Sequence, residues 1–203
     1  MSATLDRWSV YLPQDRRHAM AAGLELPQIS SGAALFADIS GVTPPAEALV
    51  IAPGPRRGGS VISFSGDAIT CWFDSEPIGV YARAAAQSAP GPQPLVGPQA
   101  AAQRAAACAL AMQYVMHTLR VVAIPGGAAV SLAIKVALAQ GMVRRFQVGD
   151  PQLQYIDTLA GATLDRLAAG ERQAQRGEVI AAEDLVTALG AACVVRQWRI
   201  ETG

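Results

Sequence analysis

The chain has 203 residues, of which 51% are hydrophobic and 16% are charged, enough for one domain with a short extension. This composition supports a buried core and excludes a chain that is disordered throughout. The formal net charge is zero, with 16 basic and 16 acidic side chains, so no basic excess is available to bind nucleic acid through its phosphates. We therefore expect no nucleic-acid partner. Lys135 is the only lysine, and all other basic residues are arginines.

The sequence also predicts neither a membrane protein nor a secreted one. The best apolar stretch, Val121 to Ile134, is interrupted at residues 125–127 and is too short for a spanning helix. The first residues lack the basic region and apolar core of a signal peptide. Three widely spaced cysteines form neither a metal-ligand pair nor a disulfide framework, and we expect them to be buried in a reducing cytoplasm: Cys71, Cys108 and Cys193.

The first segment, residues 1–31, is expected to be an arm, and residues 32–203 are expected to form a single domain. Within the arm the pattern predicts a short helix over Arg7 to Ala22, interrupted by Pro13. Ala33 to Ile39 is apolar at odd and even positions alike, which predicts a central strand buried on both faces. A short helical piece is expected at residues 46–50.

A β-hairpin is the clearest local structure in the sequence. Two strand-like runs, Ser60 to Ser65 and Ala68 to Phe73, are separated only by Gly66 and Asp67. Glycine supplies the positive φ that a two-residue hairpin loop requires. The next stretch is rich in proline and alanine and predicts a loop near residues 76–98.

The second half of the chain alternates predicted helices and strands. An alanine-rich helix is expected over Gln99 to Arg120, and a second hairpin around Gly141, between strands at residues 130–140 and 142–148. The remaining segments predict a helix, a strand, a helix and a last strand, over residues 159–175, 178–180, 182–189 and 192–200. This order fits an α+β fold of the ferredoxin-like kind, an antiparallel-rich sheet with helices packed on one face.

Two aspartates are the strongest candidates for chemistry. Asp38 closes the first strand and Asp67 lies in the first hairpin, and a ferredoxin-like sheet places these two elements side by side. Two nearby carboxylates repel each other unless a cation neutralises them, and Mg²⁺ or Mn²⁺ bridging to phosphates does so. Spacing alone leaves a second interpretation open, in which both residues serve only turn chemistry.

The residues around both aspartates resemble a known family. Leu35 to Thr43 resembles the F-x-D-I-x-G-F-T signature of class III adenylate and guanylate cyclases, and Phe64 to Phe73 resembles their metal-binding Gly-Asp hairpin. Leu138 to Gly141 resembles their H-T-G turn, and residues 154–165 resemble an altered Y-D-x-W-G-x-x-V-N-x-A-x-R motif. The resemblance covers residues 33–200 and implies an α+β catalytic domain that works as a homodimer, with active sites built across the interface.

The resemblance also implies roles for individual residues. Asp38 and Asp67, with the carbonyl group of Ile39, correspond to the ligands of two metal ions, Mg²⁺ or Mn²⁺. The backbone N–H groups of one short segment would lie where the phosphates bind: Ile39, Ser40, Gly41, Val42 and Thr43. The implied reaction converts ATP to cyclic AMP and pyrophosphate by positioning and charge neutralisation.

Several positions depart from the family pattern. The two purine-selecting positions hold Ser63 and Thr158, and threonine is acceptable for adenine, so ATP is favoured over GTP. The ribose-orienting asparagine is replaced by Asp165, and the transition-state arginine is replaced by Ala169. Arg166 and Arg172 lie one helical turn either side of that alanine, and Arg172 is the first candidate to substitute for the missing arginine. The alternative is that these arginines only form a solvated helix face.

These departures leave two hypotheses open. The first is a weakly active nucleotidyl cyclase that uses Asp38, Asp67, Asp165 and Arg172. The second is a catalytically degenerate cyclase-like module that regulates or dimerises within cytoplasmic signal transduction. The segment between the two metal-binding aspartates is also short for the two helices that family members place there, which bears on dimer geometry. The expected partners are ATP and a second copy of the chain.

Overall fold

The computed structural model describes residues 12–40, 58–76, 96–118, 121–123, 129–150 and 154–200. A mixed sheet with the strand order β2-β3-β1-β6-β7 forms its centre, and β8 pairs with β6 outside this path. The strands are β1 (Ile29–Ser40), β2 (Ser60–Ser65), β3 (Ala68–Asp74), β6 (Ala133–Asp150), β7 (Gln154–Ala160) and β8 (Val179–Ala181). A separate ribbon consists of β4 (Val121–Ala123) and β5 (Ala129–Ser131). The helices are α2 (Gln14–Ala21), α5 (Pro98–Thr118), α6 (Ala162–Gln173) and α7 (Glu183–Leu189).

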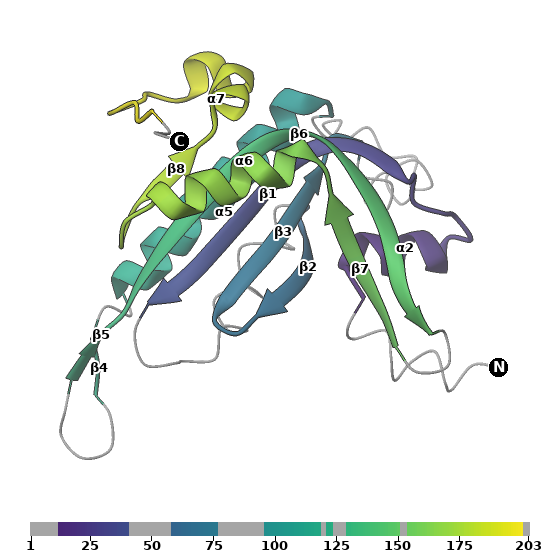
Figure 1. Cartoon of the computed structure of the whole chain (residues 1–203), viewed down its shortest axis with the longest axis horizontal. Helices are drawn as coiled ribbons and strands as arrows, with labels where there is room; N and C mark the ends of the chain where they lie inside the picture. The colour runs from purple at the N-terminus through teal and green to yellow at the C-terminus, as the bar shows by residue number, and fades with distance from the viewer. Residues whose placement is uncertain are drawn as a thin grey trace, which may run out of the picture.

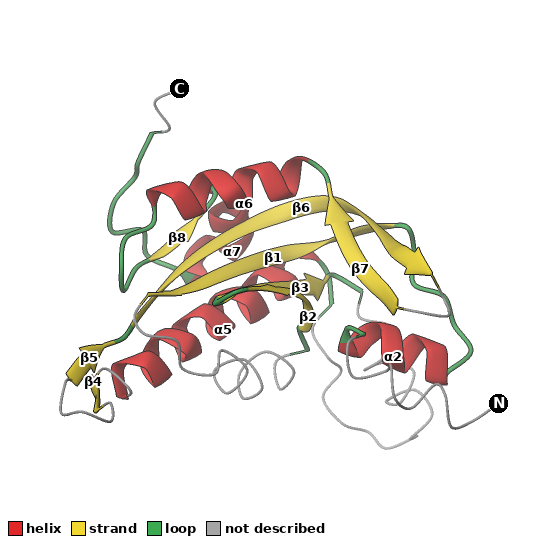
Figure 2. Ribbon diagram, turned by 60° about the horizontal axis from the view of Figure 1, so that its bottom comes forward, coloured by secondary structure: helices red, strands yellow, loops and turns green. Residues whose placement is uncertain are grey.

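Strand β1 is the central strand that the apolar run at residues 33–39 predicts. It pairs in antiparallel fashion with β3 on one side and with β6 on the other. Its odd-numbered residues pack in one core cluster with α5 and α7, as Leu35 does, and Ala34 packs in a second cluster with Leu167 of α6. Because β1 is apolar on both faces, both faces need cover, and the expectation of helices on only one face is wrong. Figure 2 shows α6 above the sheet and α5 below it.

The β2–β3 hairpin is confirmed. Gly66 has a φ of 62° and Asp67 follows it with negative φ, the pattern of a type II′ turn. The register of the hairpin shifts between Val61 and Ser63, so β2 carries an irregularity near its start, away from the turn. β2 and β7 stand at opposite ends of the strand order and yet contact each other, because the sheet curls.

The second predicted hairpin, around Gly141, is wrong. β6 runs through this residue as one continuous strand, pairing with β1 along its first part and with β7 along its last. Gly141 has a φ of 152°, and a Cβ atom there would lie 2.7 Å from both the Arg166 guanidinium and the Thr163 hydroxyl group. The glycine therefore provides room for α6 to approach the sheet, and does not mark a turn.

Two further features of the structure differ from the sequence predictions. α6 begins at Ala162, because the residues from 154 to 160 form β7, which the sequence analysis did not predict. The expected last strand at residues 192–200 is absent from the described part of the chain, and residues 193–200 follow α7 and its 3₁₀ turn without regular secondary structure. The predicted helix at residues 46–50 and most of the predicted loop at 76–98 lie outside the described residues. None of the helices in the described part of the chain has the length and apolar character needed to cross a bilayer.

Helix α2 is joined to the β6–β7 end of the sheet by buried ion pairs. Arg145 of β6 pairs with Asp15 of α2 and, at 2.6 Å, with Asp157 of β7, and its side chain is only 1% exposed. The Arg16 Nε atom lies 2.6 Å from the other carboxylate oxygen of Asp157. Burial alone would lower the pKa of Arg145, but hydrogen bonds and charge attraction from the two aspartates raise it. Arg145 therefore stays charged inside the fold.

We expect R145M to lower the free energy of unfolding by about 3–5 kcal/mol, because it leaves buried carboxylates without their counter-charge. Urea denaturation measures the change. R144M is the matched control, since Arg144 is the neighbouring residue of the same strand and is exposed; its effect should stay within about 0.5 kcal/mol. Equal effects of the two substitutions would contradict a stabilising role for the buried cluster.

Candidate functional site

The two candidate aspartates belong to neighbouring elements at one end of the sheet. In the register between β1 and β3, Asp38 lies opposite Ala68, the residue directly after Asp67. The backbone N–H of Ile39 donates to the carbonyl oxygen of Asp67 at 3.4 Å, so the turn that carries Asp67 lies against the end of β1. Figure 1 shows the β2–β3 turn beside this end of β1. Both aspartate side chains are partly accessible to solvent.

A lysine faces Asp38 from the strand on its other side. Lys135 of β6 is the direct cross-strand partner of Asp38, and its Nζ atom lies 3.3 Å from the Asp38 Oδ2 atom. The same Nζ atom lies 2.6 Å from the Oε1 atom of Glu171, which projects from α6. The hydrogen bond that Lys135 donates to Glu171, followed by the one that it donates to Asp38 and the charges of both carboxylates, raises the pKa of Lys135. The ammonium group is therefore shared between two carboxylates.

Neither Lys135 nor Glu171 was among the residues predicted to form a site. Lys135 stood out in the sequence only as the single lysine. Its role depends on the register of β6 against β1 and on the placement of α6, and neither can be obtained from local sequence patterns. A lysine in a strand flanked by apolar residues was the one available signal.

The chemistry of this edge fits a hard divalent cation. It offers carboxylate oxygens from Asp38 and Asp67 and backbone carbonyl groups at the end of β1, the donor types that Mg²⁺ and Mn²⁺ prefer. Within the described residues, no three His, Cys, Asp or Glu side chains lie close enough together to form a metal site by themselves. A metal ion here would thus need further oxygen donors, which a bound polyphosphate can provide.

The exposed side of α6 carries the predicted ribose and transition-state positions. Asp165 and Arg172 are exposed and Ala169 is partly buried, and their spacing places all three on one side of the helix. Arg166 instead binds structural groups: its Nε atom lies 2.7 Å from Asp184 of α7, and its Nη2 atom donates to the Gln140 carbonyl group at 2.9 Å. Arg166 is therefore committed to joining α6, α7 and β6.

The two predicted purine-selecting residues lie in the first and last strands of the strand order, which contact each other where the sheet curls. Ser63 lies in β2 opposite Thr70, and Thr158 lies in β7 opposite Phe146. Both side chains are partly buried. The predicted phosphate-binding segment is only partly described, because Ile39 and the backbone of Ser40 belong to β1 while Gly41, Val42 and Thr43 lie outside the described residues.

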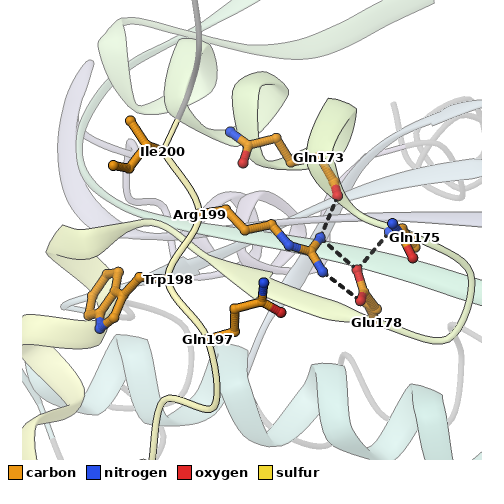
Figure 3. A pocket seen from close by; sticks show the side chains of 7 residues that line it. All are labelled: Gln173, Gln175, Glu178, Gln197, Trp198, Arg199 and Ile200. Carbon is orange, nitrogen blue, oxygen red and sulfur yellow. Dashed lines mark hydrogen bonds and ion pairs between the residues drawn. The ribbon is translucent and has the colours of Figure 1, made fainter.

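A surface pocket of about 770 Å³ lies elsewhere, between the end of α6 and the C-terminal segment. Figure 3 shows the Arg199 guanidinium directed toward Glu178, which it contacts at 2.7 and 2.9 Å, and toward the Gln173 carbonyl oxygen. Arg199 also lowers the pKa of Glu178. The pocket contains no residue predicted to take part in chemistry, and its one ion pair, Glu178 with Arg199, holds the C-terminal segment in place. The residues that line the pocket are Gln173, Gln175, Glu178, Gln197, Trp198, Arg199 and Ile200.

Comparison with known proteins finds similarity in structure only. No protein-family model and no curated protein matches the chain by sequence. The catalytic core of a rhodopsin-guanylyl cyclase with converted specificity, in complex with ATPαS, superposes with a TM-score of 0.57 at 19% identity, covering 83% of this chain and 88% of that one. A non-canonical dimeric guanylyl cyclase domain of the RhoGC fusion protein from the aquatic fungus Blastocladiella emersonii gives a TM-score of 0.57 at 19% identity, covering 81% of this chain and 87% of that one. A bacterial light-regulated adenylyl cyclase gives 0.61 at 16% identity, covering 95% of this chain and 54% of that one.

The protein has the fold of a class III nucleotidyl cyclase catalytic domain. Within this cyclase fold, the elements that carry Asp38 and Asp67 meet at the C-terminal end of the central strand β1. Asp165 and Arg172 project from the exposed side of α6. Thr158 belongs to β7, which stands at the opposite end of the strand order from β2.

Proposed function

We propose that the protein is a nucleotidyl cyclase-like domain that binds ATP with Mg²⁺ or Mn²⁺ at the edge formed by Asp38 and Asp67. Its turnover to cyclic AMP and pyrophosphate is slow. The register that brings the β2–β3 turn against the end of β1 is the observation that carries this proposal. The cyclase fold also supports the proposal. The sequence motifs and the strand pairing independently indicate the same two carboxylates, those of Asp38 and Asp67.

In this proposal Asp38, Asp67 and the carbonyl group of Ile39 hold the metal. A divalent ion there supplies charge neutralisation of the triphosphate and activation of the attacking hydroxyl group. The carboxylates keep their donor oxygens at the edge because β1 is paired on both sides and cannot shift its register without moving its apolar residues out of both cores. The ATPαS complex of the rhodopsin-guanylyl cyclase core agrees with a nucleotide as ligand of this fold.

We expect slow turnover because the exposed side of α6 has no cationic side chain at the transition-state position, where this reaction needs one. A transition state that gathers negative charge on phosphoryl oxygens is stabilised by cationic donors placed in advance. Ala169 offers no donor, Asp165 adds a negative charge, and Arg166 is engaged with Asp184. Arg172 is the one arginine of α6 whose exposed position on this side suits contact with a nucleotide.

A homodimer is part of the proposal. Apolar side chains are exposed on one face of the two paired strands β6 and β7. The register places Phe146 beside Thr158 and Val148 beside Ile156. Exposed apolar surface of this kind is typical of a protein interface. A second copy is the occupant we propose, because the Blastocladiella domain of the same fold forms a dimer, although a non-canonical one. Thr158 would then face the partner, as expected for a residue that completes a site across an interface.

A second candidate function is a regulatory or dimerisation module without turnover. The cation already placed beside Asp38, together with Asp165 and Ala169 on α6, favours it. The two candidates share the fold and the dimer and differ in whether bound nucleotide is converted. Metal binding, product formation and assembly are therefore tested separately.

Mn²⁺ should raise the melting temperature of the protein, because a ligand that binds only the folded state stabilises it. D38N and D67N should each abolish the rise, which thermal unfolding with and without MnCl₂ measures. E183Q is the control, since it removes one carboxylate from the exposed start of α7. A rise that persists in both aspartate variants would place the metal elsewhere.

Cyclic AMP formation from ATP and Mn²⁺ should be barely above background. The double variant D165N/A169R should raise it by about 10²–10³, since a positioned cationic donor is commonly worth that factor in rate. In free energy of activation, the gain of the double variant should exceed the sum of the gains of the two single variants, because both residues would act on one nucleotide. Quantifying the product by mass spectrometry checks this. Fast wild-type turnover that R172M abolishes would show instead that Arg172 already supplies the missing charge.

Light scattering at tens of micromolar protein should give the mass of a dimer. F146D should shift it to the mass of a monomer, because a charge buried without a partner opposes association. L110D changes an exposed apolar residue of α5 and serves as the control, with no expected effect on mass. A monomeric wild-type protein would contradict both the dimer and an active site shared between copies.

A further inference from the structure

Lys135 occupies a position that bears directly on metal binding. Its Nζ atom lies between a carboxylate of β1 and one of α6, at 3.3 Å from Asp38 and 2.6 Å from Glu171. All three side chains are partly accessible to solvent, at 25%, 27% and 28% for Lys135, Asp38 and Glu171. The ammonium group is thus a built-in cation beside one of the two aspartates that would hold a metal ion.

A lysine ammonium and a divalent cation compete for the same carboxylate. The ammonium is a compact point charge with three donors, and it neutralises Asp38 without any metal. A metal ion that approaches Asp38 meets the repulsion of this charge at short range. The metal must therefore displace the ammonium from Asp38 or bind in its presence at reduced affinity.

Glu171 offers the displaced ammonium an alternative partner. The Lys135–Glu171 contact is already the shorter of the two. α6 is held to the sheet at its first turns, where Thr163 donates to the Met142 carbonyl group at 2.8 Å and Arg166 to that of Gln140. Because the helix is anchored in this way, Glu171 keeps its place when Asp38 changes partner.

We propose that Lys135 sets the metal affinity of Asp38 by competing for its carboxylate, and that Glu171 holds the ammonium group when a metal ion binds. This inference rests on the proposed function, since it assumes a metal site at Asp38. It predicts a metal-free state in which Lys135 is shared and a metal-bound state in which Lys135 contacts only Glu171. Glu171 and Lys135 are thus positioning residues, without contact to the reacting atoms.

Calorimetric titration with MnCl₂ tests the competition. K135Q should bind Mn²⁺ about tenfold more tightly than the wild-type protein, which corresponds to about 1.4 kcal/mol. E171Q should bind Mn²⁺ about threefold more weakly, because the Lys135 ammonium group then has only Asp38 as a partner. This loss of affinity should be smaller in the K135Q background. R17Q is the control, since Arg17 is exposed on α2 and its loss changes the net charge equally. D38N/K135Q should not bind.

The single lysine permits a second measurement on the unaltered chain. Protein labelled with ¹³Cε-lysine and freed of any tag gives one lysine signal, that of Lys135. Saturating Mg²⁺ should shift this signal in the wild-type protein and leave it unmoved in D38N. This measurement does not require K135Q to fold.

The outcomes separate this inference from the function on which it rests. Equal Mn²⁺ affinity in K135Q, R17Q and the wild-type protein, or a lysine signal that does not move at saturating Mg²⁺, overturns the competition and leaves the metal site intact. Absence of Mn²⁺ binding in both the wild-type protein and K135Q overturns the metal site itself, and the competition with it.

Discussion

The pairing of β1 with a neighbour on each side positions the candidate site. Its register against β3 sets Asp38 opposite Ala68, and its register against β6 sets the same residue opposite Lys135. A slip of one residue would turn Leu35 and its odd-numbered neighbours toward α6, exchanging two cores of different composition. The hydrophobic core thus holds the register, and the register places the ammonium group of Lys135 beside Asp38.

The electrostatics of this edge explain how two acidic residues are tolerated in one place. Like charges on neighbouring elements destabilise a fold unless a cation neutralises one of them or solvent screens them. Lys135 supplies one such cation, and Glu171 shares it. The cluster around Arg145, at the other end of the sheet, differs in its burial, since Arg145 and Asp157 are both withdrawn from solvent. The exposed edge can exchange its cation and the buried cluster cannot.

Much of the fold is readable from local sequence. Gly66 in a two-residue loop predicts the β2–β3 hairpin because only a turn with positive φ closes so short a connection. The apolar run at residues 33–39 predicts a strand covered on both faces for an equally local reason. Gly141 shows the limit, since glycine usually marks a turn, whereas here it gives Thr163 and Arg166 room against β6. The need for that space comes from α6, which is distant in sequence.

The candidate site likewise contains residues that the sequence predicts and residues that it does not. Asp38 and Asp67 stand out because each lies in a recognisable motif at a strand end or turn. Lys135 and Glu171 do not, because their meeting depends on strand register and on the packing of α6. The C-terminal segment is a further example: its valines predict a strand, but Arg199 fixes the segment by pairing with Glu178 without a strand forming.

A crystal structure with Mn²⁺ and a non-hydrolysable ATP analogue tests the central claim most directly. Anomalous scattering locates manganese independently of the refined atoms. The account predicts a manganese peak bound by Asp38 and Asp67, next to the triphosphate, with the Lys135 ammonium group in contact with Glu171 alone. Nucleotide bound away from this edge, or no manganese at either aspartate, would contradict it.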